Sequence, residues 1–161
     1  MIRRKPLTDE QALLKMMDLC ARSEQSTGEI RLKLIRKGIS GPRADAIIGR
    51  LVADRFVDNA RFARAFTADK VRFALWGRRK IRMALAAKGI EAAAISAALA
   101  GIDEDEYAEA LMKAARGKAR GVDMADYEER VRLYRSLASR GYEPEAIARV
   151  IARLKTEASG R

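Results

Sequence analysis

The chain has 161 residues, 48% hydrophobic and 34% charged, a composition that favours a folded domain over a disordered segment. Its net charge of +11 favours polyanionic partners. Histidine is absent and Cys20 is the only cysteine, which excludes an intramolecular disulfide and indicates a reducing compartment. No membrane span or signal-peptide core is visible, so we expect a cytoplasmic protein that does not act at a membrane.

The first predicted helix begins at Thr8, where Thr8 and Gln11 have the spacing of a capping box. A second capping box opens at Ser26, and its helix is expected to close at Gly38, which suits the left-handed residue after a helix. Pro42 fits the first turn of a third helix. The N-terminal third of the chain therefore predicts three consecutive helices.

The middle of the chain repeats this plan. A helix from residues 58–59 carries Phe62, Phe66 and Phe73, which we interpret as core side chains. Gly77 opens the next helix, which carries Ile81 and Leu85 toward the core. A short alanine-rich helix follows, from about residue 91 to residue 100.

The C-terminal third begins with the acidic run 103–106, which suits the positive end of a helix. Further helices are expected after Asp126 and from Pro144, and residues 117–123 form the one long connection. No segment alternates with the two-residue period of a strand. The fold class is therefore all-α.

Three local sequences that centre on Gly38, Gly89 and Gly141 recur 51 and 52 residues apart. Aligning these glycines also aligns apolar positions before and after them, which indicates one supersecondary unit written three times. We divide the chain into repeats over residues 1–58, 59–103 and 104–161. The aligned positions are Ile30, Ile81 and Leu133; Leu34, Leu85 and Leu137; Ile39, Ile90 and Tyr142; Ile48, Leu99 and Ile151; and Leu51, Ile102 and Leu154.

Catalytic chemistry finds little support in the sequence. General acid–base catalysis and zinc binding most often recruit histidine, and no nucleotide-binding glycine motif occurs. The acidic residues between Asp103 and Glu109 are explained by a solvated helix start. We expect no enzyme, no cofactor, no metal site and no small-molecule substrate.

Basic residues concentrate in the middle repeat, which carries a net charge of +6 against +4 and +1 for its neighbours. Residues 70–89 contain seven cations and no acid. Helical geometry places Arg78, Arg79 and Arg82 beside the buried stripe, where guanidinium groups can meet phosphates or carboxylates, although such a face can also be merely solvated. The candidate binding residues are Arg72, Trp76, Arg78, Arg79, Lys80, Arg82 and Lys88, with a second patch of Arg31, Lys33, Arg36 and Lys37.

Trp76 has two interpretations. It could stack on a base, as the aromatic residues of single-strand binders do, and so could Phe73 just upstream. Its position beside Gly77 favours packing between helices.

Residues 56–66, 76–82 and 85–90, in this order and spacing, resemble the RecX family of bacterial recombination regulators. Ser26 to Ile39 and the segment that starts at Arg140 agree, so the resemblance spans about residues 8–155. It implies three tandem three-helix repeats in an elongated, curved arrangement.

The resemblance also implies a function without catalysis. Family members bind the RecA recombinase and RecA filaments on single-stranded DNA, and inhibit its recombinase, ATPase and coprotease activities. They thereby modulate homologous recombination, DNA repair and the SOS response to DNA damage, and some bind DNA directly, which we expect to be weaker. The alternative is a stand-alone nucleic-acid-binding repeat protein that needs no recombinase.

Overall fold

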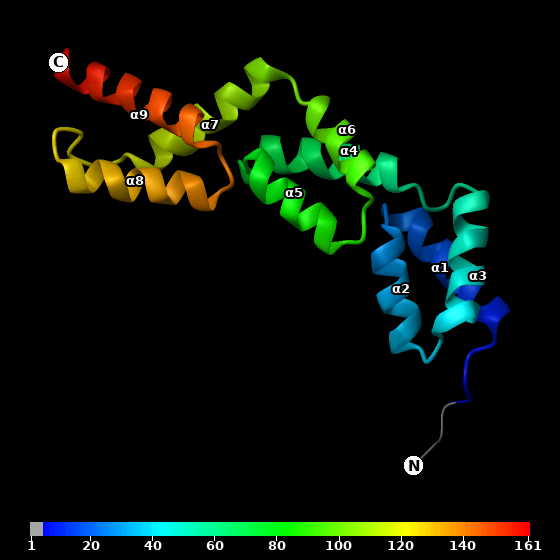
Figure 1. The fold of residues 1–161 in the computed structure, drawn as a ribbon. Coiled ribbons are helices and arrows are strands. Elements are labelled where there is room, and N and C mark those ends of the chain that lie inside the picture. The colour runs from blue at the N-terminus through cyan, green and yellow to red at the C-terminus, as the bar shows by residue number, and fades with distance from the viewer. Residues whose placement is uncertain (1–4) are drawn as a thin grey trace. The chain divides into compact units, whose positions relative to one another are not determined.

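The computed structural model describes residues 5–161, which contain nine α-helices, one π-helical turn and no strand (Figure 1). The all-α prediction is thus confirmed, and no helix in this part is long and apolar enough to cross a membrane. The elements are α1 (Asp9–Arg22), α2 (Thr27–Arg36), α3 (Gly41–Ala53), α4 (Asn59–Asp69), the π-helical turn η1 (Lys70–Ala74), α5 (Arg78–Ala87), α6 (Ala92–Ala100), α7 (Glu104–Lys118), α8 (Tyr127–Ser139) and α9 (Pro144–Ser159).

The helix starts and stops follow the predicted local signals. Thr8 and Ser26 each form a complete capping box, in which the cap and the third helical residue exchange hydrogen bonds. Asp126 accepts hydrogen bonds from the first turn of α8. Gly38 closes α2 with φ +82°, a conformation that glycine adopts without steric cost.

The chain forms two compact units. Unit 1 takes the described residues up to Ala63 together with Leu85–Ile95, and unit 2 takes Arg64–Ala84 and Ser96–Arg161. The middle repeat therefore contributes residues to both units. Each unit is described separately below.

The core of unit 1 lies among α1, α2 and α3, where α3 packs on both α1 and α2 (Figure 1). Ile30 and Leu34 of α2 and Leu51 of α3 are fully buried there, with Ala12 and Met16 of α1 completing the cluster. Ile30, Leu34 and Leu51 are positions that the repeat alignment predicts. Burying such side chains supplies the main stabilisation of a bundle.

The core of unit 2 lies among α7, α8 and α9, which pack against one another, and η1 packs on α7. Leu133 and Leu137 of α8, Ile147 of α9 and Tyr142 between these helices are buried. Two of the aligned apolar positions, Ile102 and Ile151, are only half-buried, and the rest lie in the cores of the two units.

One core prediction is wrong. Phe73 was expected to continue the buried stripe of Phe62 and Phe66, but its side chain is 80% exposed. The reason is η1, because a π-helical turn holds one more residue than an α-helical turn and so shifts the register. Val71 is buried in this segment instead, and Leu75 ends it in the left-handed conformation at φ 54°.

Unit 1 contains a tight junction between the start of α2 and the end of α5. A Cβ atom added to Gly28 would lie 2.2 Å from the carbonyl oxygen of Lys88, so only glycine fits. The hydroxyl of Ser26 donates to that same oxygen at 2.9 Å. Asn59 stabilises this contact with hydrogen bonds to both sides. Its Oδ1 accepts the Thr27 backbone N–H, and its Nδ2 donates to Glu91.

Unit 2 contains the corresponding junction, one repeat further along the chain, between the start of α5 and the end of α8. The backbone N–H of Gly77 donates to the Arg140 carbonyl at 2.7 Å, and that of Arg79 donates to the Gly141 carbonyl at 3.0 Å. The Tyr107 hydroxyl accepts the Arg78 backbone N–H and donates to Glu143. One helix end thereby satisfies the free backbone groups of another.

Candidate functional site

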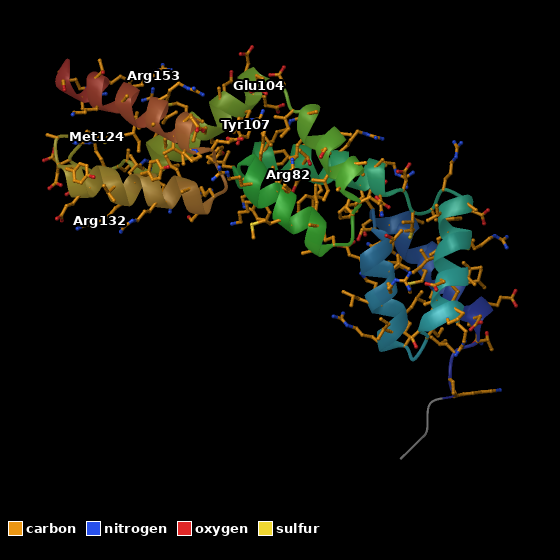
Figure 2. All side chains as sticks on the ribbon, viewed as in Figure 1. Arg82, Glu104, Tyr107, Met124, Arg132 and Arg153 are labelled. Carbon is orange, nitrogen blue, oxygen red and sulfur yellow. The ribbon has the colours of Figure 1, made fainter. Side chains whose placement is uncertain are left out.

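The basic segment 70–89 lies on η1, α5 and the residues around them. Ile81 and Leu85 bury one side of α5, and Arg79 and Arg82 are exposed on the helix. Figure 2 labels Arg82 on α5. No ion pair within residues 5–161 includes either arginine. Both guanidinium groups are therefore available to an external anion.

Arg78 has a different role from its two neighbours. Its guanidinium lies 4.0 Å from the centre of the Tyr107 ring and pairs with Glu104 and, at 3.3 Å, with Glu143. Figure 2 shows Glu104 at the start of α7 and Tyr107 within that helix. Burial is the main cause that raises the pKa of Tyr107. Arg78 thus stabilises unit 2 from within.

Arg72 is exposed but paired with Glu106 of α7. The hydrogen bond to this carboxylate raises the pKa of the Arg72 guanidinium above its ordinary value. Glu104 and Glu106, from the acidic run at the start of α7, thus have arginine partners, and Asp103 caps the helix. Within residues 5–161, no group of three or more His, Cys, Asp or Glu side chains is placed to hold a metal ion.

Trp76 is half-buried at the end of η1, in an edge-to-face contact with Phe66 at 6.2 Å between ring centroids. The ammonium groups of Lys70 and Lys80 lie 5.0 and 4.4 Å from the indole centre. The indole is thus packed on Phe66 and also forms part of a cationic surface.

Lys88 belongs to unit 1, where its ammonium lies 2.6 Å from Glu29 and 5.9 Å from the Phe62 ring centre. It contributes to the junction of that unit. The sequence predicted a single basic run from Lys70 to Lys88, but its members divide between units and between internal and external roles.

The second predicted patch lies on α2. Arg31 pairs with Asp45 at 2.7 Å and Lys33 donates to Gln25, whereas Arg36 and Lys37 are exposed and enter no ion pair in the described part of the chain. A groove of about 470 Å³ between α1 and α2 includes Lys33, Arg36 and Lys37, with Lys15 and Arg22 of α1 opposite. The sequence reasoning missed Lys15 and Arg22, since only the packing of α1 on α2 brings them to this patch.

Arg140 was also missed. It ends α8, and its guanidinium donates to the carbonyl oxygen of Ala74 at 3.1 Å, beside the segment that carries Trp76. The repeat alignment offered the signal, because Arg140 stands where Lys88 stands in the preceding repeat.

Taken together, these features define a helical repeat protein with a basic surface and helix-end junctions. Three models of the RecX family match it in order: the first three-helix domain over residues 12–51, the second over 58–99 and the third over 104–151. The chain belongs to the RecX family.

Relatives and solved structures agree with this assignment. The chain is 31% identical to a regulatory protein RecX of Mycobacterium ulcerans over 98% of its own length and 92% of the relative. It is 33% identical to one of Pseudomonas savastanoi over 84% of its length and 86% of the relative. The fold is similar to that of RecX from Lactobacillus salivarius, with a TM-score of 0.80 at 17% identity, covering 92% of this chain and 97% of that one.

Proposed function

We propose that this protein regulates the RecA recombinase by binding RecA and RecA filaments on single-stranded DNA. In this role it inhibits the recombinase, ATPase and coprotease activities and so modulates DNA repair and the damage response. It acts in the cytoplasm by binding alone, without a cofactor. Membership of the RecX family, over essentially the whole chain, is the observation that carries the proposal.

The free cations support a binding role. Arg79 and Arg82 on α5 and Arg36 and Lys37 on α2 are exposed without ion pairs in the described chain. A recombinase filament presents DNA phosphates together with acidic protein groups, and cations on separate repeats can contact both. Several modest contacts, linked through one chain, add to a strong interaction without one deep pocket.

The test compares bare and RecA-coated single-stranded DNA. Fluorescence anisotropy of a labelled oligonucleotide is titrated with the protein, with and without prior coating by RecA and a slowly hydrolysed nucleotide. We expect much tighter binding to the coated strand. Equal or tighter binding to bare DNA would favour the alternative, a stand-alone nucleic-acid-binding protein.

A pair of double variants locates the contact. Arg79→Glu with Arg82→Glu should relieve inhibition of the RecA ATPase. Arg135→Glu with Lys155→Glu applies the same charge change at exposed residues outside the basic segment, and should leave inhibition intact. Undiminished inhibition by the first variant, with its helical circular dichroism unchanged, would exclude Arg79 and Arg82 as contacts.

A further inference from the structure

The two junctions differ at one pair of equivalent positions. In unit 1, the repeat alignment places Glu29 on α2 and Lys88 after α5, and their side chains form an ion pair at 2.6 Å. The same two positions, one repeat later, are Lys80 on α5 and Arg140 after α8. An opposite-charge pair in one junction is therefore a like-charge pair in the other.

The backbone geometry brings Lys80 and Arg140 together. A Cβ atom added to Gly141 would lie 2.5 Å from the Lys80 Cβ, and the neighbouring Arg79 N–H donates to the Gly141 carbonyl. The side chains of Lys80 and Arg140 therefore start from neighbouring backbone positions in the junction. The equivalent side chains of unit 1 meet at 2.6 Å, so the same backbone arrangement allows Lys80 and Arg140 to reach one anion together.

Residues 5–161 supply no such anion. Lys80 lies over the Trp76 ring and Arg140 donates to the Ala74 carbonyl, and neither enters an ion pair in residues 5–161. Lys70, also over the indole, has only a loose contact with Asp69 at 3.6 Å. The ring face and the carbonyl hold the two cations in place without neutralising them.

We propose that Lys80 and Arg140 form a cradle for one oxyanion, the backbone phosphate of a single nucleic-acid strand. Phosphate accepts charge-assisted hydrogen bonds from an ammonium and a guanidinium at once. Arg79, which precedes Lys80 on α5, is exposed and forms no ion pair in residues 5–161, so it can extend the cationic surface toward an adjacent phosphate. This continuity favours a strand, which carries regularly spaced charges, over a single carboxylate.

The cradle deepens the proposed function, because it specifies where the protein contacts DNA within the recombinase complex. The cradle rests on the proposed function only for the complex in which it would act, and not for its ability to bind DNA. Binding to bare DNA tests the cradle, whereas inhibition of RecA tests the function. A protein whose cradle binds DNA but which ignores RecA would disprove the function alone.

The decisive variant is Lys80→Glu, which copies the unit 1 arrangement. Its carboxylate should pair with Arg140, as Glu29 pairs with Lys88, and so keep the fold while removing both cations from the cradle. Binding of a labelled oligothymidylate is followed at several salt concentrations. Loss of the one phosphate contact lowers the slope of log K against log salt by about 0.7 and the affinity at 0.1 M salt by about 5-fold.

Two further variants complete the design. Lys155→Glu makes the same charge change on α9, outside the junction, and should retain the wild-type slope. Lys80→Gln removes one cation without adding an acid, and should lower the slope by less than about 0.7 because Arg140 still faces the phosphate. This variant keeps the test valid if Lys80→Glu folds poorly.

The results have separate meanings. Equal slopes for Lys80→Glu and Lys155→Glu, both folded, would overturn the cradle. A polyglutamate peptide of matched charge serves as the competing ligand. If it binds as tightly as the oligonucleotide and loses affinity equally in Lys80→Glu, the site takes carboxylates and the assignment to nucleic acid is wrong.

Discussion

Units 1 and 2 each contain a junction between the start of one helix and the end of the equivalent helix in the next repeat: α2 meets α5 in unit 1, and α5 meets α8 in unit 2. The two junctions use different side chains. Unit 1 uses Asn59 to bridge Thr27 and Glu91, and unit 2 uses Tyr107 to bridge Arg78 and Glu143. Thr27 and Arg78 are equivalent in the repeat, as are Glu91 and Glu143. The contact pattern is therefore kept while the residue that completes it changes.

Charge distinguishes the junctions further. Unit 1 neutralises its junction internally with Glu29 and Lys88, whereas unit 2 leaves Lys80 and Arg140 without a carboxylate partner in the described chain. An internal ion pair contributes to stability alone, and uncompensated cations remain available to a ligand. The comparison shows that equivalent positions in repeats can form an ion pair in one copy and leave two unpaired cations, the proposed phosphate site, in the next.

The largest expected effects contrast two phenylalanines. Phe62 in unit 1 is 6% exposed, and Phe62→Ala should lower the free energy of unfolding by about 3–5 kcal/mol. Phe73 in unit 2 is 80% exposed, and Phe73→Ala should change the free energy of unfolding by no more than about 0.5 kcal/mol. Urea denaturation measures both, and similar losses would contradict the register shift at η1.

The junction glycines come next. Gly28→Ala and Gly77→Ala place a Cβ 2.2 and 2.3 Å from backbone atoms of the facing helix end, and each should cost about 1–3 kcal/mol or more. Gly49→Ala in α3 is the matched control, because no heavy atom lies within 4 Å of its added Cβ. The free energy of unfolding of this control should rise by about 0.5–1 kcal/mol. Tolerance of either junction variant in a urea titration would show that the junction is open in solution.

The bridging side chains provide a third comparison. Asn59→Ala in unit 1 and Tyr107→Phe in unit 2 each leave a backbone N–H without its side-chain acceptor and remove one hydrogen bond to a glutamate, at a cost of about 1–3 kcal/mol. Local probes separate the units: Cys20 thiol reactivity reports on unit 1, and Trp76 fluorescence on unit 2. Tyr127→Phe, at an exposed tyrosine, should change neither probe. A response of both probes to each variant would mean that the units unfold together.

The smallest effect at neutral pH concerns Tyr142. Burial raises the pKa of Tyr142 from about 10 to about 12. Between these values the unfolded chain loses a proton that the folded chain keeps, so this contribution to stability is complete below pH 10 and is lost as the pH rises toward 12. All four tyrosines lie between residues 107 and 142, so the effect falls on unit 2.

Tyr142→Phe isolates this contribution. Its hydroxyl is buried without a hydrogen-bond partner, so the variant should be close to neutral in stability at pH 7. Urea midpoints from pH 9 to 11 should then fall less steeply for the variant than for the wild type. Parallel curves would mean that Tyr142 ionises freely in the folded protein.

The fold was largely predictable because its signals are local. The caps at Thr8, Ser26 and Asp126 and the closing Gly38 specify helix ends within a few residues of sequence. The repeat alignment added the core positions. The π-helical turn could not be predicted from the sequence. Phe73 has the spacing of a regular α-helix, and this spacing does not reveal the extra residue in the turn.

For the candidate site, the sequence predicted only where basic residues concentrate. The sequence located the basic segment, but Arg78 and Arg72 turned out to have carboxylate partners on α7. Those partners are 26 and 34 residues away, and only tertiary packing reveals them. The binding role of Arg79, Arg82 and the other candidates remains a prediction until the charge variants are measured.

The junctions are built mainly from backbone atoms and glycines, and this bears on how such a chain diverges over time. Gly77 and Arg79 contact the end of α8 through N–H and carbonyl groups that every residue except proline possesses. The surrounding surfaces can therefore drift without separating the repeats, provided the few glycines persist. The Lactobacillus salivarius protein shares the fold at only 17% identity, which is the degree of divergence that such junctions would tolerate.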